Sequence, residues 1–99
     1  MLRHIVMFNY AKNFSAEENA ANAQKIKRDL ESLTNLDGVL EMKVYINELQ
    51  YSNMDIMLDS SFENEAALVA YKNHPAHLKA VDFINSALTN RTCFDYIQP

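Results

Sequence analysis

One stretch of the chain, residues 70–77, concentrates side chains that could carry out acid–base chemistry. It holds two of the three histidines, His74 and His77, together with a tyrosine and Pro75. Proline suits the first position of a helix and pushes the residue before it out of the helical conformation. We therefore expect one helix to end near Asn73 and another to begin at Pro75, with His74 at the break and His77 in the first new turn.

The spacing of these two histidines also raises the question of a metal site. Zinc needs three or four protein ligands, and His74 should lie at the helix break rather than on the face of His77. We therefore expect no metal ion. The single cysteine, Cys93, is expected to be a small core residue rather than a nucleophile, since no base lies near it in the sequence.

Composition narrows the class of protein. The 99 residues are 48% hydrophobic and 22% charged, which is typical of one soluble domain over residues 1–99. A net charge of -4 without a basic cluster argues against nucleic-acid binding. A lone cysteine excludes an internal disulfide, and no apolar stretch approaches the roughly 20 residues of a membrane span. We expect a cytoplasmic protein with no nucleic-acid or membrane partner.

The hydrophobic pattern predicts six elements in the order β-α-β-β-α-β. Strands are expected over residues 2–10, 39–47, 54–62 and 91–97 from their period-2 alternation. A capping box at Ser15 and Glu18 starts the first helix, which should end near Asn35 before a turn at Gly38. The second helical region covers residues 63–88, broken at His74. This order predicts an α+β, ferredoxin-like fold: a four-stranded antiparallel sheet with two helices on one face.

Alternation along the strands also predicts which side chains share a face. The expected helix-side sets are Leu2, His4, Val6, Phe8 and Tyr10; Leu40, Met42, Val44 and Ile46; and Cys93, Asp95 and Ile97. A helical stripe of Leu78, Val81, Ile84 and Leu88 should pack on them. The other face would still carry Ile5, Met7, Val39, Tyr45 and Met57. An apolar sheet face of this size indicates an interface, and a two-fold homodimer covers both copies with one patch.

Several segments, taken in chain order, resemble the stress-responsive α/β-barrel (Dabb) domain family. They are His4-Ile5-Val6-Met7-Phe8, Asp37-Gly38-Val39, Met54-Asp55-Ile56-Met57-Leu58, Phe62-Glu63, Ala67-Leu68, Tyr71, His74-Pro75-Ala76-His77 and Phe94-Asp95-Tyr96. The match covers nearly the whole chain, and the Tyr…His-Pro-x-His segment is its most specific part. The resemblance implies a ferredoxin-like protomer that dimerises into a β-barrel.

The resemblance also implies a candidate site. One plant branch of the family consists of polyketide cyclases that close a ring by aldol chemistry without a cofactor. Their working groups look similar to His4, Tyr71, His77 and Asp95. In this hypothesis His77 is the general base, Asp95 fixes its tautomer, Tyr71 donates to the oxyanion, and His4 binds or polarises the substrate. Alternatively, His77 and Asp95 are a buried structural pair and Tyr71 is a core residue whose hydroxyl is satisfied.

Two functional interpretations follow, and neither needs a cofactor. The first is a dimeric module of unassigned activity that binds a small hydrophobic, carbonyl-bearing ligand. The alternative is an enzyme of the polyketide cyclase, lyase or isomerase type with His77 as its base. An open cavity that reaches the His77 imidazole would favour the enzyme, and burial of these residues without a cavity would favour the module.

Overall fold

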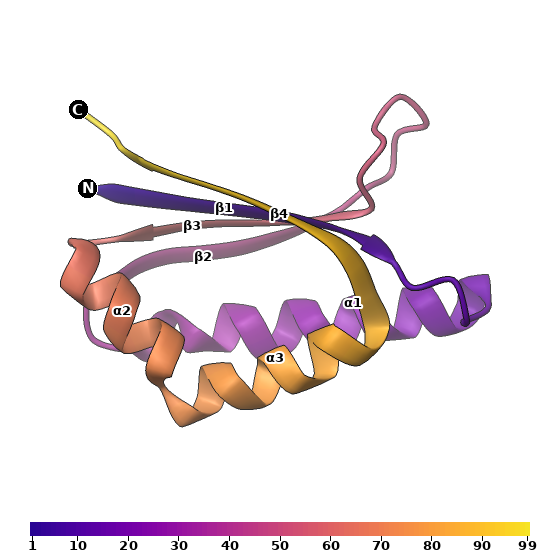
Figure 1. The fold of residues 1–99 in the computed structure, drawn as a ribbon, viewed down its shortest axis with the longest axis horizontal. Helices are drawn as coiled ribbons and strands as arrows, with labels where there is room; N and C mark the ends of the chain where they lie inside the picture. The colour runs from indigo at the N-terminus through magenta and orange to yellow at the C-terminus, as the bar shows by residue number, and fades with distance from the viewer.

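The chain folds into a four-stranded antiparallel sheet with every helix on one side of it, as the computed structural model of residues 1–99 shows (Figure 1). The elements are β1 (Leu2–Tyr10), α1 (Ala16–Glu31), the 3₁₀ turn η1 (Ser32–Asn35), β2 (Val39–Ile46), β3 (Ile56–Phe62), α2 (Glu65–Asn73), α3 (Pro75–Ala87) and β4 (Leu88–Ile97). The strands lie in the order β2-β3-β1-β4. The predicted α+β fold is confirmed, with the second helical region divided into α2 and α3.

The helix boundaries follow the local signals in the sequence. The Ser15 hydroxyl accepts from the Glu18 amide and the Glu18 carboxylate from the Ser15 amide, which completes the predicted capping box. At the second break, His74 is extended and its Nδ1 accepts from the Ala76 amide at 3.1 Å, while Pro75 occupies the first helical position. The predicted break at His74 is confirmed, and it fixes where His77 lies.

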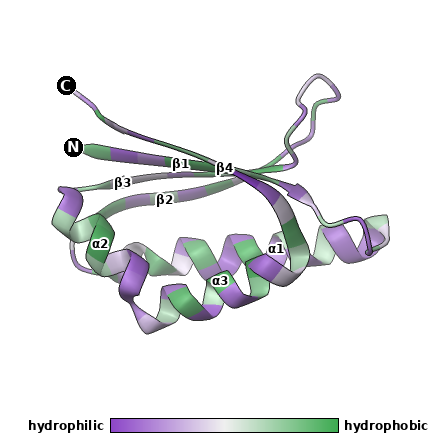
Figure 2. Cartoon of the chain, viewed as in Figure 1, coloured by the Kyte–Doolittle hydropathy of each residue, from purple (hydrophilic) through white to green (hydrophobic).

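The core lies between the sheet and the helices. β1 supplies Leu2, His4, Val6 and Phe8, and α1 supplies Ala23, Ile26 and Leu30. Bands of hydrophobic and hydrophilic residues alternate along α1 and α3 (Figure 2). Such a pattern lets each helix bury one stripe and leave the other in water.

One assignment of side chains to a sheet face was wrong, and two residues that were expected in the core, Cys93 and Leu78, are exposed. The register of β2 against β3 shifts between Val39 and Glu41, so Val39 is buried and Leu40 is 49% exposed, the reverse of the prediction. Cys93 is exposed because β4 is an edge strand that the helices leave largely uncovered. In α3 the buried residues include Ala80 and Ile84, whereas Leu78 is half exposed.

The face opposite the helices has no covering layer (Figure 1). It presents Ile5, Met7 and Met57, which are partly buried, and Tyr45, Phe94 and Tyr96, which are exposed. The connection over residues 47–55 rises from the sheet on this same side (Figure 1). No helix in the chain is long and apolar enough to cross a membrane.

Candidate functional site

A cavity of about 310 Å³ lies between the sheet and α3. Its walls come from β1, α1, β3, the end of α2, α3 and the start of β4; the lining residues are His4, Val6, Phe8, Leu30, Leu58, Tyr71, Lys72, His77, Leu78, Val81, Ile84, Asn85 and Arg91. Its volume is at the lower end of the range of about 300–1,000 Å³ that is usual for small-molecule pockets. The cavity therefore joins three of the four predicted site residues and suits a small, mainly apolar ligand.

His77 is held in one tautomer by the chain itself. Its Nδ1 lies 3.0 Å from the main-chain carbonyl oxygen of Lys72. A carbonyl oxygen can only accept, so Nδ1 carries the proton and Nε2 keeps a free lone pair. Burial lowers the pKa of His77, and the positive charges of Lys72 and Arg91 lower this pKa further. The ring is therefore a neutral base at neutral pH, on the wall of the cavity.

Asp95 orients His4 and not His77, which corrects the sequence hypothesis. The two residues are directly opposite in the β1–β4 register, and the His4 Nδ1 is hydrogen-bonded to the Asp95 carboxylate. Burial of His4, which is 3% exposed, lowers its pKa more than Asp95 raises it. Although desolvation raises the pKa of Asp95, the hydrogen bond from His4 brings it below its usual value. His4 is thus a neutral imidazole with its proton on Nδ1.

Tyr71 lies directly against His77. Its ring centroid is 4.3 Å from that of His77 and 5.0 Å from that of Phe62. The side chain is buried, and its hydroxyl has no hydrogen-bond partner in the protein. Burial raises the pKa of the phenol, so it stays protonated. Tyr71 therefore carries a buried, protonated hydroxyl without a protein partner, and the alternative in which this hydroxyl is satisfied within the protein is wrong.

A trio of potential metal ligands adjoins this site. One ligand atom from each of His4, Cys93 and Asp95 lies within 4.8 Å of the other two. The His4 Nδ1 already shares a proton with the Asp95 carboxylate, so an ion here would have to displace that proton. His74 and His77 belong to no such group of three potential ligands.

A comparison with models of known protein families identifies the family of this chain. The family model "Dabb: Stress responsive A/B Barrel Domain" matches residues 2–98. The chain belongs to this family. The predicted resemblance is thereby confirmed over nearly the whole length of this Dabb domain.

Solved structures agree with the family assignment. A dimeric ferredoxin-like protein of unknown function from Bacteroides fragilis is 26% identical, with a TM-score of 0.89 over 96% of this chain and 93% of that one. A Dabb family protein from Mesorhizobium loti is 20% identical, with a TM-score of 0.72 over 99% and 96%. The hydroxynitrile lyase of Passiflora edulis is 19% identical, with a TM-score of 0.80 over 99% and 93%. No curated protein matches the sequence.

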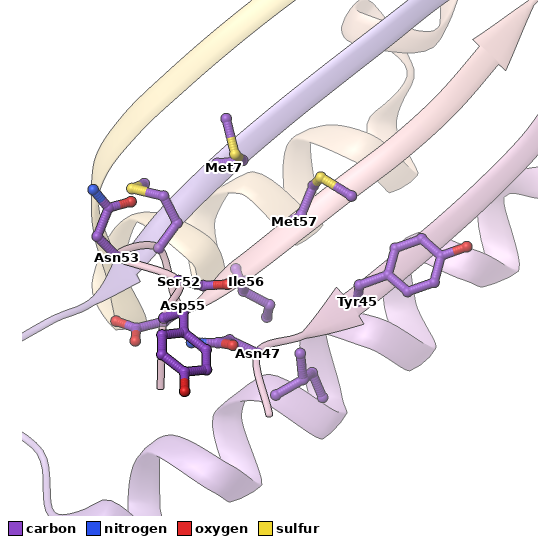
Figure 3. Close-up of a pocket in the computed structure, with 11 residues that line it drawn as sticks. Met7, Tyr45, Asn47, Ser52, Asn53, Asp55, Ile56 and Met57 are labelled. Atoms are coloured by element: carbon purple, nitrogen blue, oxygen red, sulfur yellow. The ribbon is translucent and has the colours of Figure 1, made fainter. Parts of the chain in front are cut away.

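A second cavity, of about 400 Å³, opens on the uncovered face of the Dabb domain (Figure 3). Met7, Met57 and Tyr45 line it from the strands, and Asn53 and Asp55 line it from the 47–55 connection (Figure 3). It contains none of the predicted site residues. Although this cavity is larger, its lining holds no imidazole and only one carboxylate, Asp55, so it lacks a general base suited to neutral pH.

Sequence reasoning missed several residues of the helix-side cavity. Leu78 and Val81 were assigned to the core, but they line the cavity instead. The signal that could have identified them is the apolar stripe of α3, to which both residues belong. Lys72 and Arg91 were not singled out at all, and nothing in their local sequence distinguishes them from solvated surface charges.

Proposed function

We propose that this Dabb domain is a homodimer that binds a small carbonyl-bearing molecule in the helix-side cavity and transfers a proton from it to His77. The reaction class is a cofactor-free lyase, cyclase or isomerase. The observation that carries the proposal is the cavity of about 310 Å³ that reaches a histidine fixed in its basic tautomer. This is the arrangement that separates the enzyme from the module in the sequence argument.

The proposed step uses groups that the cavity already supplies. His77 Nε2 takes the proton from the carbon next to the carbonyl; the electron pair of that C–H bond forms the new C=C bond, and the π pair of the carbonyl moves onto its oxygen. The Tyr71 hydroxyl donates to the resulting enolate oxygen. The enolate then attacks a second carbonyl, is reprotonated elsewhere or expels a leaving group, and the His77 imidazolium returns its proton.

His4 takes a different part from the one first expected. With its proton on Nδ1 and directed to Asp95, its Nε2 can only accept a hydrogen bond. It is therefore suited to binding a substrate hydroxyl and not to polarising a carbonyl. Asp95 acts through His4 as a positioning residue.

The homodimer accounts for the uncovered face of the sheet. Ile5, Met7, Phe94 and Tyr96 would be covered by the same residues of a second copy. Similar solved structures from three bacteria are described as dimeric, which supports self-association. We also place the protein in the cytoplasm, because an exposed free thiol at Cys93 fits a reducing compartment.

A binding module without turnover is the second candidate. The observation that favours it is the deep burial of two site residues, since His4 is 3% and Tyr71 2% exposed. Such a protein would bind the same class of ligand and exchange no protons. The similarity to a hydroxynitrile lyase supports the enzyme as a precedent for catalysis on this fold.

Hydrogen–deuterium exchange tests the reaction class without knowledge of the natural substrate. The dimer is incubated in D₂O with levulinate, its methyl ester and short methyl ketones, and loss of the α-proton signals is followed by NMR. We expect catalysed exchange, and His77→Ala should lower its rate by roughly 10²–10⁴-fold.

The matched control is His74→Asn, which removes the neighbouring imidazole but keeps a side chain that can cap α3. It should exchange as fast as the wild type. Binding without catalysed exchange in any of these compounds would favour the module. Exchange that survives in His77→Ala would contradict the role of His77.

A further inference from the structure

Two cationic side chains, Lys72 and Arg91, line the helix-side cavity, and no acidic side chain does. Neither cation forms a salt bridge, whereas Arg3, Lys25 and Lys27 are paired with Asp59, Asp29 and Glu31. The nearest acid identified at the site is Asp95, whose carboxylate accepts a hydrogen bond from neutral His4 and keeps one negative charge. The cavity therefore combines apolar walls with two cations, and their charge exceeds that of the neighbouring carboxylate.

The positive charge reaches both imidazoles. Lys72 and Arg91 each lower the pKa of His4 and of His77, after the larger effect of burial. Both residues are exposed to solvent and also line the cavity. A ligand in the cavity could therefore reach them without their leaving water.

Arg91 lies on the helix side of β4, in phase with Cys93 and Asp95, and an irregularity follows in the strand toward its start. Pairing with β1 shifts between Met7 and Asn9, and Asn90 has a φ of 56°, held by a hydrogen bond from its Nδ2 to the Asn9 Oδ1 at 3.2 Å. An extra residue in a strand reverses the alternation beyond it. As a result, Leu88 is also buried beneath the sheet, on the same side as Arg91, which lines the helix-side cavity.

Lys72 serves the site in two ways. Its main-chain carbonyl fixes the tautomer of His77, and its side chain lines the same cavity. An anion bound near this ammonium group would therefore lie near the base as well. Substitution of the side chain leaves the carbonyl in place, so the two contributions can be separated.

We infer that the ligand of this cavity is an organic carboxylate with a short apolar body, its carboxylate held by Lys72 and Arg91. Arginine binds a carboxylate through two parallel hydrogen bonds, and lysine adds a compact charge. The body would pack against Val6, Leu78 and Val81. The inference deepens the proposed function and rests on it for the position of the carbonyl group beside His77. In that case the substrate is an oxo acid.

Levulinate and its methyl ester test this directly, because they share one oxo-acid skeleton and differ in charge. Binding to the wild-type dimer is measured from amide chemical-shift changes in NMR. We expect the acid to bind at least about tenfold more tightly than the ester, as a charge-assisted hydrogen bond predicts. Lys72→Met and Arg91→Met should each reduce this preference, and Arg91→Lys should retain part of it. Lys79→Met, an exposed lysine of α3 outside this cavity, is the control and should retain all of it.

Other outcomes overturn the inference. Equal binding of the acid and the ester would overturn it, and so would a failure of both to bind. It would also be overturned if the preference for the acid survived in the Lys72→Met/Arg91→Met double variant, with the fold of that variant verified by circular dichroism. Tighter binding of inorganic phosphate than of levulinate would assign the site to phosphoryl groups instead. Selective binding of the acid without proton exchange would contradict the proposed reaction and leave this inference standing. Proton exchange in the ester as fast as in the acid would support the proposed reaction and contradict the inference that the ligand is a carboxylate.

Discussion

The two faces of the sheet carry different chemistry on the same strands. On β1, His4 and Val6 face the cavity beneath the helices, whereas Ile5 and Met7 face the uncovered side. The period of two in a β-strand makes this separation possible, because neighbouring residues never share a face. One strand can therefore supply both a binding site and an interface. A substitution on one face should leave the function of the other face nearly intact.

The residues that line the two cavities differ in the same way as the two faces of the sheet. The helix-side cavity has two neutral histidines and two cations, and the cavity on the uncovered face has methionines, tyrosines and amides. The second suits the adaptable packing of another copy, since methionine fills irregular gaps. What lines a cavity, more than its volume, indicates its use.

A charge on the uncovered face should have the largest effect. Met7→Glu places a carboxylate in the proposed interface, and we expect the dimer dissociation constant to rise at least about a hundredfold, because an unpaired buried charge costs several kcal/mol. Sedimentation across a concentration series measures this. The control is Val69→Glu on α2, where the wild-type side chain is 56% exposed, and it should leave association unchanged. Equal association of both variants would mean that another surface joins the copies.

Removal of one oxygen on the helix side should separate stability from catalysis. Because the Tyr71 hydroxyl is buried without a partner, Tyr71→Phe should be as stable as the wild type or gain up to about 1–3 kcal/mol in a thermal melt. Proton exchange should slow by roughly 10²–10³-fold if the hydroxyl stabilises the enolate. Tyr45→Phe, on the uncovered face, should change neither quantity. A clear loss of stability in Tyr71→Phe would show that the hydroxyl has a partner.

Acid should weaken the helix-side core first. Burial lowers the pKa of both His4 and His77, so below about pH 6.5 the unfolded chain binds more protons than the folded one. The free energy of unfolding should therefore fall as pH drops from about 6.5 through the lowered pKa values of the folded state. Thermal melts in steps of about one pH unit between about pH 7.5 and 5 measure this fall in stability. The fall should be shallower in His77→Ala, which has one fewer buried histidine. A melting temperature that stays constant over this range would contradict the assigned neutral histidines.

The smallest expected effect is a shift in the titration midpoint of one histidine and not of the other. Asp95 raises the pKa of His4, so Asp95→Asn should lower the NMR titration midpoint of His4 and leave that of His77 nearly unchanged. Signals of the imidazole Cε1–H protons report both midpoints in one experiment. A shift confined to His77 would restore the pairing first inferred from the sequence.

Local signals made much of the fold predictable. The capping box at Ser15 and the break before Pro75 are properties of adjacent residues, and both lie where the sequence placed them. The same break correctly placed Tyr71 and His77 on either side of His74. Both of these residues reach the cavity because two short helices meet there.

Long-range pairing made the rest unpredictable. His4 is bonded to Asp95 because β1 and β4 pair in a register that sets them opposite each other, and no single segment contains that register. The shifts near Leu40 and Asn90 also depend on the partner strand. Alternation puts Arg91 on the face of Cys93 and Asp95, but the cavity on that face arises only where α2 and α3 meet the sheet.

The central claim is that neutral His77 is the base in the helix-side cavity. Its most direct test compares two midpoints: the NMR titration of His77 and the pH dependence of α-proton exchange in levulinate. We predict that the rate rises with pH through the same midpoint as the His77 titration, that this midpoint lies below the usual value of about 6.5, and that the rate is level above it. A rate whose midpoint differs from that of His77, or that does not change as His77 titrates, would contradict the claim.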